Sequence, residues 1–195
     1  MVSIPVVDDG LVFDSTWVTA EEIREDNAHG GVRVRLMGKL GPAEIPIQID
    51  IGVGDVVTPA PGNAAFPTLL DFPAPQVRTY PVYTVIAEKF EAMVKLGIAN
   101  TRMKDFHDVW FLAQRFELDP TILRQAIDAT FARRQTKLPP GPEPFTDTFA
   151  NDPAKQAQWA AFLRRNGLTG MTNQFHEVVA ALRRFIEPVL RLPGI

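Results

Sequence analysis

The chain has 195 residues, of which 46% are hydrophobic and 22% are charged, as in an ordinary globular protein large enough to bury a core. Its formal net charge of −3 excludes an overall positive field for nucleic acid or anionic lipid, and the absence of cysteine excludes disulfides and thiolate metal sites. No apolar stretch is long enough to span a membrane, and the first residues lack a secretory signal, so we expect a cytoplasmic protein without a membrane partner.

The first part of the chain predicts β-structure. A strand is expected at residues 17–23, followed by an acidic turn at residues 25–31. Residues 32–40 and 45–51 alternate between apolar and polar side chains around Gly41-Pro42, which is typical of an antiparallel hairpin.

A symmetric turn in this hairpin places Arg33 opposite Asp50. Asp50 is then one half of a cross-strand ion pair, worth under about 1 kcal/mol, or a carboxylate that projects into a cleft and binds a metal ion. A carboxylate in an isoleucine-rich strand is unusual, and the residues alone leave both interpretations open.

Residues 56–82 are rich in proline and predict an extended connector dominated by loops. Inside it, the apolar residues of the segment 69–72 are expected to anchor the connector to the core.

Residues 83–116 predict two amphipathic helices separated by a short polar break. In the first helix, Lys89 lies within the edge of the apolar stripe, whereas Glu88, Glu91 and Lys95 form the solvated side. A lysine that points inward loses hydration, so it needs an anionic or polar partner.

The second helix is expected to begin near Asn100-Thr101 and to bury Phe116 near its end. Asp105 and Asp108 share one of its faces, with Lys104 and Arg102 beside them. The plain interpretation is surface pairing of about 0.3–0.5 kcal/mol per pair. The inward Lys89 weakens the case for this interpretation and keeps a functional cluster open as the alternative.

The C-terminal part predicts helices. Asp119-Pro120 and Asp152-Pro153 each place a capping residue before a proline at the first helical position, and the second of these helices ends at Asn166-Gly167. A basic cluster at residues 133–137 suits a helix C-terminus, residues 139–144 predict a stiff linker, and residues 172–190 predict the last helix. The pattern therefore indicates an α+β protein with a β-rich region and connector at residues 1–78 and a helical domain at residues 79–195.

Several chemistries are excluded, because the chain has no Gly-rich phosphate loop, no G-x-S-x-G elbow and no H-E-x-x-H motif. His107-Asp108 resembles the central dyad of HD phosphohydrolases, but that site needs further histidines, and His29 and His176 are distant in sequence. The remaining candidates are carboxylates, which suit Mg²⁺, and a lysine, which suits the phosphates that the metal bridges.

Three segments, IPIQIDIGVGD, TVIAEKFEAMV and NTRMKDFHDVWFLAQRF, resemble the AbiEii/AbiGii-type nucleotidyl transferases, the toxins of type IV toxin–antitoxin and abortive-infection systems. The resemblance extends from Leu11 to Asn166 and implies a fold related to polymerase β. It also implies transfer of a nucleotide from an NTP to an acceptor, possibly tRNA or another RNA, and an antitoxin protein as a partner.

The resemblance implies a role for each candidate residue. Asp50 matches a metal-binding aspartate, and Lys89 is expected to contact the nucleotide phosphates, with Lys104 and Arg102 also binding the nucleotide. Asp105 and Asp108 are expected to help build the catalytic site. The implied cofactor is Mg²⁺.

The chain departs from the family pattern because it contains no D-x-D motif and no G-S or G-G-T-A loop before Asp50. We therefore expect only a partial nucleotidyltransferase-like antiparallel or mixed sheet, lacking its N-terminal part, followed by the helical unit. The chain alone is expected to be inactive, with Mg²⁺ bound only in a complete form of the site and an exposed sheet edge available for self-association. The alternative is a non-catalytic helical interaction module that binds a partner such as an antitoxin.

Overall fold

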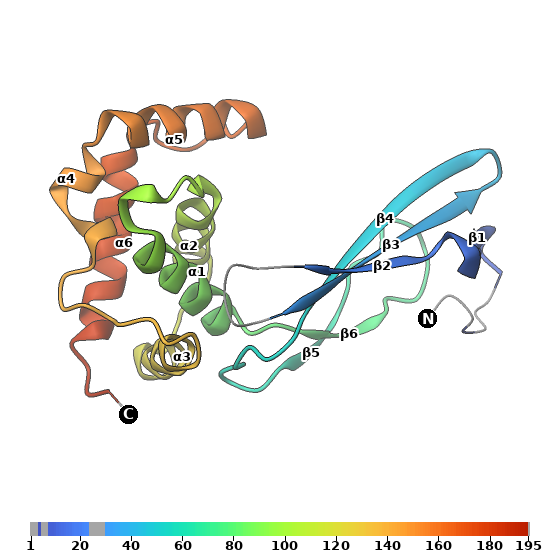
Figure 1. Cartoon of the computed structure of the whole chain (residues 1–195), viewed down its shortest axis with the longest axis horizontal. Helices are drawn as coiled ribbons and strands as arrows, with labels where there is room; N and C mark the ends of the chain where they lie inside the picture. Colours follow the sequence, from blue (N-terminus) through green and yellow to red (C-terminus); the bar gives the residue numbers. More distant parts are fainter. Residues whose placement is uncertain (1–3, 5–7, 24–29, 195) are drawn as a thin grey trace. The chain divides into compact units, whose positions relative to one another are not determined.

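The computed structural model describes residues 4, 8–23 and 30–194, so His29 and most of the predicted acidic turn lie outside the described residues. Helices and antiparallel sheets are both present, which confirms the predicted α+β class (Figure 1). The chain divides into two compact units, Met1–Asp55 and Val56–Ile195. The domain division predicted after residue 78 stays a prediction.

The first unit is a sheet built around one long strand. It contains β1 (Leu11–Phe13), β2 (Thr19–Ile23), β3 (Gly31–Leu40) and β4 (Ala43–Gly52). β3 pairs with β1 and β2 along one edge and with β4 along the other, always antiparallel. The strand predicted from Trp17 begins at Thr19 instead, because Asp14 caps the 3₁₀ turn η1 (Ser15–Trp17).

The β3–β4 hairpin confirms the predicted register. Gly41 has φ +56°, a conformation that glycine adopts without strain, and Arg33 lies opposite Asp50. The apolar side chains of β3 and β4 share one face, yet Leu36 is the only large apolar side chain that is buried among the described residues of this unit.

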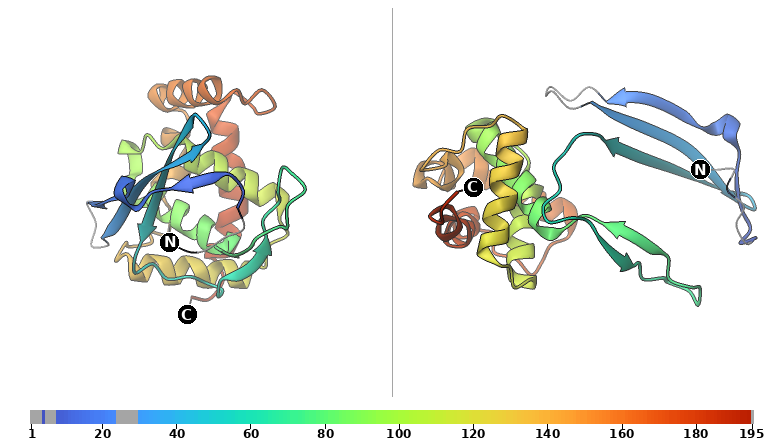
Figure 2. Two further views of the ribbon diagram at one scale, coloured as in Figure 1. Left: turned by 90° about the vertical axis from the view of Figure 1, so that its right-hand side faces the viewer. Right: turned by 90° about the horizontal axis from the view of Figure 1, so that it is seen from below.

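The second unit begins with a hairpin that the sequence did not predict, β5 (Gly62–Ala65) paired with β6 (Gln76–Thr79). The expected anchor at residues 69–72 is wrong, since Leu69, Leu70 and Phe72 are exposed, Leu69 completely. They lie in the loop that joins the two strands, and this hairpin extends away from the helices of its unit (Figure 2), so the loop has no core within reach.

The helical part follows the predicted order. It consists of α1 (Val82–Leu96), η2 (Gly97–Ala99), α2 (Met103–Arg115), α3 (Pro120–Arg133), η3 (Glu143–Phe145), α4 (Asp147–Ala150), α5 (Pro153–Asn166) and α6 (Phe175–Leu190). Asp119 and Asp152 accept hydrogen bonds from backbone N–H groups of the first turn, and Gly167 ends α5 in the left-handed conformation, as predicted.

Two predicted boundaries in the helical part are corrected. The linker predicted at residues 139–144 is shorter than expected, because η3 already begins at Glu143. Phe145 of η3 and Phe149 of α4 are both buried in the core. Phe116 is half exposed rather than buried, because α2 ends at Arg115 and Phe116 already has an extended backbone.

The core of this unit is aromatic. α1 packs on α2 and α3, and α6 contacts α2, α3, α4 and α5. Phe106 lies between Phe149 and Phe175, with ring centroids 5.8 and 5.1 Å away, and Trp159 is completely buried with its indole N–H donating to the carbonyl of Thr172. These contacts fix the positions of α2 and α5 relative to each other.

Glu91 does not lie on the solvated side of α1 but is only 2% exposed. Nη1 of Arg134, which follows α3, lies 3.0 Å from Oε2 of Glu91, and the Thr136 hydroxyl donates to Oε1. Arg134 also lies 3.7 Å from Glu88, so it joins the end of α3 to α1 in addition to suiting a helix C-terminus.

Candidate functional site

The inward lysine has the anionic partners that its position requires. Lys89 is largely buried on α1, and its Nζ lies 3.0 Å from Oδ1 of Asp105 and 2.7 Å from Oδ2 of Asp108, both on α2. Asp105 is itself only 2% exposed. The structure therefore brings together three of the four residues predicted to be catalytic.

Two further cations border this cluster from the solvent side. Arg102 Nε lies 2.8 Å from Oδ2 of Asp105, and Lys104 Nζ lies 3.7 Å from Oδ2 of Asp108. The Arg102 and Lys104 side chains are 60% and 74% exposed, so both can turn toward a ligand. Three cations thus surround two carboxylates, which leaves an excess of positive charge.

The ion pairing keeps Lys89 and Asp108 ionised at neutral pH. Burial by itself lowers the pKa of Lys89, but the hydrogen bonds and charges of Asp108 and Asp105 raise that pKa above its ordinary value. Burial likewise raises the pKa of Asp108, and the hydrogen bonds from Lys89 and His107 overcome it, so that the pKa lies below its ordinary value.

A buried turn positions the start of α2. The side-chain oxygen of Asn100 accepts the backbone N–H of Arg102 at 2.7 Å, and its carbonyl accepts Nζ of the buried Lys155 of α5 at 2.6 Å. α2 consequently begins at Met103, slightly later than predicted, and its first turn presents Asp105 to Lys89.

A hollow of about 540 Å³ lies beside the cluster. Its lining comes from α1, the start of α2 and one stripe of α5, and consists of Lys89, Thr101, Arg102, Met103, Lys104, Asp105, Gln158, Phe162 and Arg165. The three α5 residues were not predicted, because nothing in their own sequence marks them as a motif. The signal that could have found them is their spacing of four and three residues, which places them on one side of a helix.

Asp50 has a different environment, in the first unit. Arg33 Nε lies 2.7 Å from Oδ1 and Nη2 lies 2.9 Å from Oδ2, while the Gln48 amide lies 3.4 Å from Oδ2. The Arg33 hydrogen bond holds the pKa of Asp50 below its ordinary value. The geometry is therefore that of the predicted cross-strand ion pair.

The residues near Asp50 do not fit a bound Mg²⁺. Arg33 occupies both carboxylate oxygens, and no group of three potential metal ligands exists among residues 8–23 and 30–194. Among the described residues, the His107-Asp108 dyad has no such group around it either. The role of Asp50 as a metal ligand stays a prediction for a form of the site that also contains the aspartates of a D-x-D motif.

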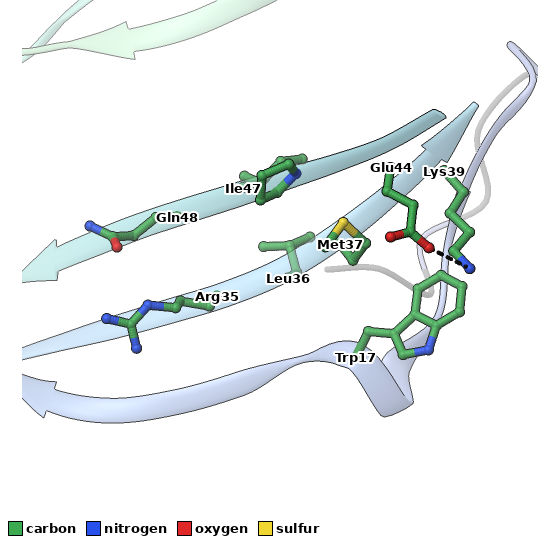
Figure 3. A pocket seen from close by; sticks show the side chains of 9 residues that line it. Trp17, Arg35, Leu36, Met37, Lys39, Glu44, Ile47 and Gln48 are labelled. Carbon is green, nitrogen blue, oxygen red and sulfur yellow. Dashed lines mark ion pairs between the residues drawn. The ribbon is translucent and has the colours of Figure 1, made fainter. Parts of the chain in front are cut away.

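A second hollow, of about 580 Å³, lies on the sheet of the first unit (Figure 3). Lys39 lies over the ring of Trp17, 4.4 Å from its centroid, and pairs with Glu44 at 3.2 Å. Arg35 at the other end pairs with Glu21 at 2.7 Å. Its two cations are balanced by two carboxylates, so this hollow offers less excess charge for an anionic substrate than the helical one, where the cations outnumber the carboxylates.

Comparison with protein families identifies a relationship. A family model described as nucleotidyl transferase AbiEii toxin, type IV toxin–antitoxin system, matches residues 5–182. The matched range includes Asp50 and every residue that lines the helical hollow. No curated protein and no solved structure matches the chain, and none of the helices in the part that the structure describes has the length and apolarity to cross a membrane.

Proposed function

The chain belongs to the AbiEii family of nucleotidyl transferase toxins of type IV toxin–antitoxin systems, and from this premise we propose that the hollow between α1, α2 and α5 binds the phosphates of an NTP. The observation that supports the proposal most is the excess of cationic side chains at this hollow, namely Lys89, Arg102, Lys104 and Arg165 against Asp105 and the neighbouring Asp108. Such an arrangement attracts a multiply charged anion.

The side chains divide this task between them. Lys89 is held by two carboxylates, so it contributes a charge at a fixed position and loses little conformational freedom when a ligand binds. Arg102 and Lys104 are exposed and supply the mobile phosphate contacts, the arginine as a planar donor pair and the lysine as a point charge. Asp105 and Asp108 act as positioning residues for Lys89.

The complete reaction needs groups beyond this cluster. We propose transfer of the nucleotide to an acceptor, which can be tRNA or another RNA, in the cytoplasm and under the control of an antitoxin. The divalent metal would be Mg²⁺, held by Asp50 together with further carboxylates that these 195 residues do not contain as a D-x-D motif.

The chain by itself is therefore expected to transfer no nucleotide. Incubation with Mg²⁺, labelled NTPs and total RNA should give no more labelled RNA than a reaction without protein. Robust labelling would contradict the proposed inactivity, although not the proposed phosphate site.

The phosphate site is tested by calorimetric titration with inorganic tripolyphosphate. The double change Arg102→Ala and Lys104→Ala is expected to weaken binding about tenfold or more, because two charge-assisted contacts are lost. The double change Arg164→Ala and Lys137→Ala serves as the control, since it removes two exposed cations that do not line the hollow. Equal weakening by both pairs would show that only the general charge matters.

The apolar tip of the β5–β6 hairpin favours a second candidate function. In this function the chain is an interaction module that binds a partner protein such as the antitoxin. Phe66, Leu69, Leu70 and Phe72 are all exposed there, and a cluster of exposed apolar side chains is a common feature of protein-binding surfaces. A chain that bound no tripolyphosphate but eluted from a sizing column together with its antitoxin would support this second function and contradict the first.

The free edge of β4 bears on self-association. β4 is ten residues long and pairs only with β3 among the described strands. Pro46 lacks an N–H, and Glu44 and Asp50 place charges along the strand, which are features that discourage pairing with another chain. We therefore propose that self-association through this edge is weak, and sedimentation at increasing concentration tests this by measuring the fraction of associated chains.

A further inference from the structure

We infer that one stripe of α5, formed by Gln158, Phe162 and Arg165, binds the nucleoside part of the ligand whose phosphates the facing cations bind. This inference rests on the proposed function and assigns a role to residues outside the segments that carry the family resemblance. The stripe lines the same hollow as Arg102, Lys104 and Asp105.

Unpaired polar atoms around the hollow point to a ligand. In the described part of the chain, three buried side-chain atoms have no hydrogen-bond partner, Asn100 Nδ2, Asp105 Oδ2 and Gln158 Oε1. Asp105 and Gln158 line the hollow, and Asn100 directly precedes Thr101, which lines it too. Arg102 Nε lies 2.8 Å from Asp105 Oδ2, but not in a direction that makes a hydrogen bond. Buried polar groups are normally paired, and Gln158 Oε1 is the atom of the three that both belongs to the lining and has no ion-pair partner among those described.

The chemistry of these atoms distinguishes a nucleoside from a phosphate. Two of these atoms, Gln158 Oε1 and Asp105 Oδ2, are acceptors, and Gln158 Oε1 has no partner among the described residues, whereas Asp105 Oδ2 has the charge of Arg102 beside it. The third, Asn100 Nδ2, is a donor outside the lining of the hollow, so a ligand that pairs with the two lining atoms must donate hydrogen bonds. The oxygens of an ionised triphosphate only accept hydrogen bonds, so they cannot pair with these atoms. Ribose hydroxyl groups and the amino groups of bases donate hydrogen bonds, and they are the parts of an NTP that the phosphate-binding cations do not use.

Phe162 supplies an aromatic surface beside these acceptors. Its ring stacks on Trp159, with centroids 5.5 Å apart, and lies 5.6 Å from the ring of His107. Trp159 is completely buried and hydrogen-bonded to the carbonyl of Thr172, so Phe162 packs against a side chain that is fixed in position. A base can stack on such a surface whatever its identity, because every base has a π face.

Arg165 completes the stripe toward solvent. It is exposed at the last turn of α5, and its Nε donates to the carbonyl of Ala161 at 3.4 Å. Gln158, Phe162 and Arg165 lie on one side of the helix, whose rotation is fixed by the buried Lys155 and Trp159. The ligand would therefore lie with its phosphates toward Arg102 and Lys104 and its nucleoside along α5.

Calorimetric titration of the whole chain with each of the four NTPs and with tripolyphosphate tests the inference. NTPs are expected to bind about tenfold tighter than tripolyphosphate, as one stacked base and its hydrogen bonds would provide. Phe162→Leu and Gln158→Leu should each remove most of this advantage while tripolyphosphate binding stays unchanged. Arg165→Ala should weaken NTP binding more than tripolyphosphate binding, because Arg165 belongs to the stripe along which the nucleoside would lie.

The outcomes separate this inference from the proposed function. Tripolyphosphate binding without any preference for NTPs would overturn the nucleoside subsite and leave the phosphate site intact. Absence of tripolyphosphate binding would overturn the phosphate site itself. Phe116→Leu and Arg164→Ala are the matched controls, since both residues are exposed and neither lines the hollow. Gln158→Leu keeps the test valid if Phe162→Leu impairs folding through its contact with Trp159.

Discussion

Replacement of Lys89 by methionine is expected to lower the free energy of unfolding by about 3–5 kcal/mol and to abolish tripolyphosphate binding. The variant keeps most of the length of the side chain but removes the charge that pairs with Asp105 and Asp108. Asp105 is almost completely buried, so it would remain as a carboxylate with Arg102 as its one ion-pair partner of those described. Urea denaturation followed by circular dichroism measures the stability, and calorimetry measures the binding.

A second change separates the two roles of Lys89. Adding Asp105→Leu to Lys89→Met removes the stranded carboxylate, so most of the lost stability should return, whereas binding should not. Lys95→Met is the control on the same helix, because Lys95 lies on the exposed side. If Lys89→Met were as stable as the unchanged chain, the ion-pair cluster would contribute nothing to the fold, and its burial would need another explanation.

The position of Lys89 could be predicted because helical periodicity is a local property. Its distance from Ile86 and Met93 places it beside the apolar stripe, and both of those residues are completely or almost completely buried. The pairing of Arg33 with Asp50 was predictable for the same reason, since a two-residue turn fixes the register of a hairpin. Capping by Asp119 and Asp152 also depends only on neighbouring residues.

Features that depend on distant segments could not be predicted. The wall of the hollow on α5 exists because Trp159 and Lys155 fix the rotation of that helix against the turn before α2. The sequence pattern of α5 alone does not indicate which other helix lies near Gln158. Likewise, the segment at residues 69–72 has the composition of a core anchor, and only the length and direction of the β5–β6 hairpin leave it exposed.

Glu91 shows the same limit within α1. It occupies a position that a single amphipathic helix would leave in water, but α3 packs against α1 and covers it. Burial of its carboxylate is tolerated because Arg134 and Thr136, more than forty residues later, both reach it. A helix with partners on two sides has two buried faces, and a single stripe cannot represent them.

Arg134→Ala is therefore expected to destabilise the protein by about 3–5 kcal/mol, as much as the loss of Lys89. The variant leaves the Glu91 carboxylate buried, with the Thr136 hydroxyl as its one remaining described donor, so folding then requires an unpaired charge in the core. The midpoint of urea denaturation should fall accordingly. Tripolyphosphate binding should persist at temperatures where the variant is folded, because neither Arg134 nor Glu91 lines the hollow.

Arg133→Ala is the matched control, since Arg133 is exposed at the end of the same helix, and it should change the stability by no more than about 0.5 kcal/mol. The combined change Glu91→Leu and Arg134→Leu removes both charges and should recover most of the stability lost in Arg134→Ala. If the Arg134→Ala protein were as stable as the Arg133→Ala control, the end of α3 would have to move away from α1 and let water hydrate the Glu91 carboxylate. The tie between α1 and α3 would then be local rather than part of the cooperative core.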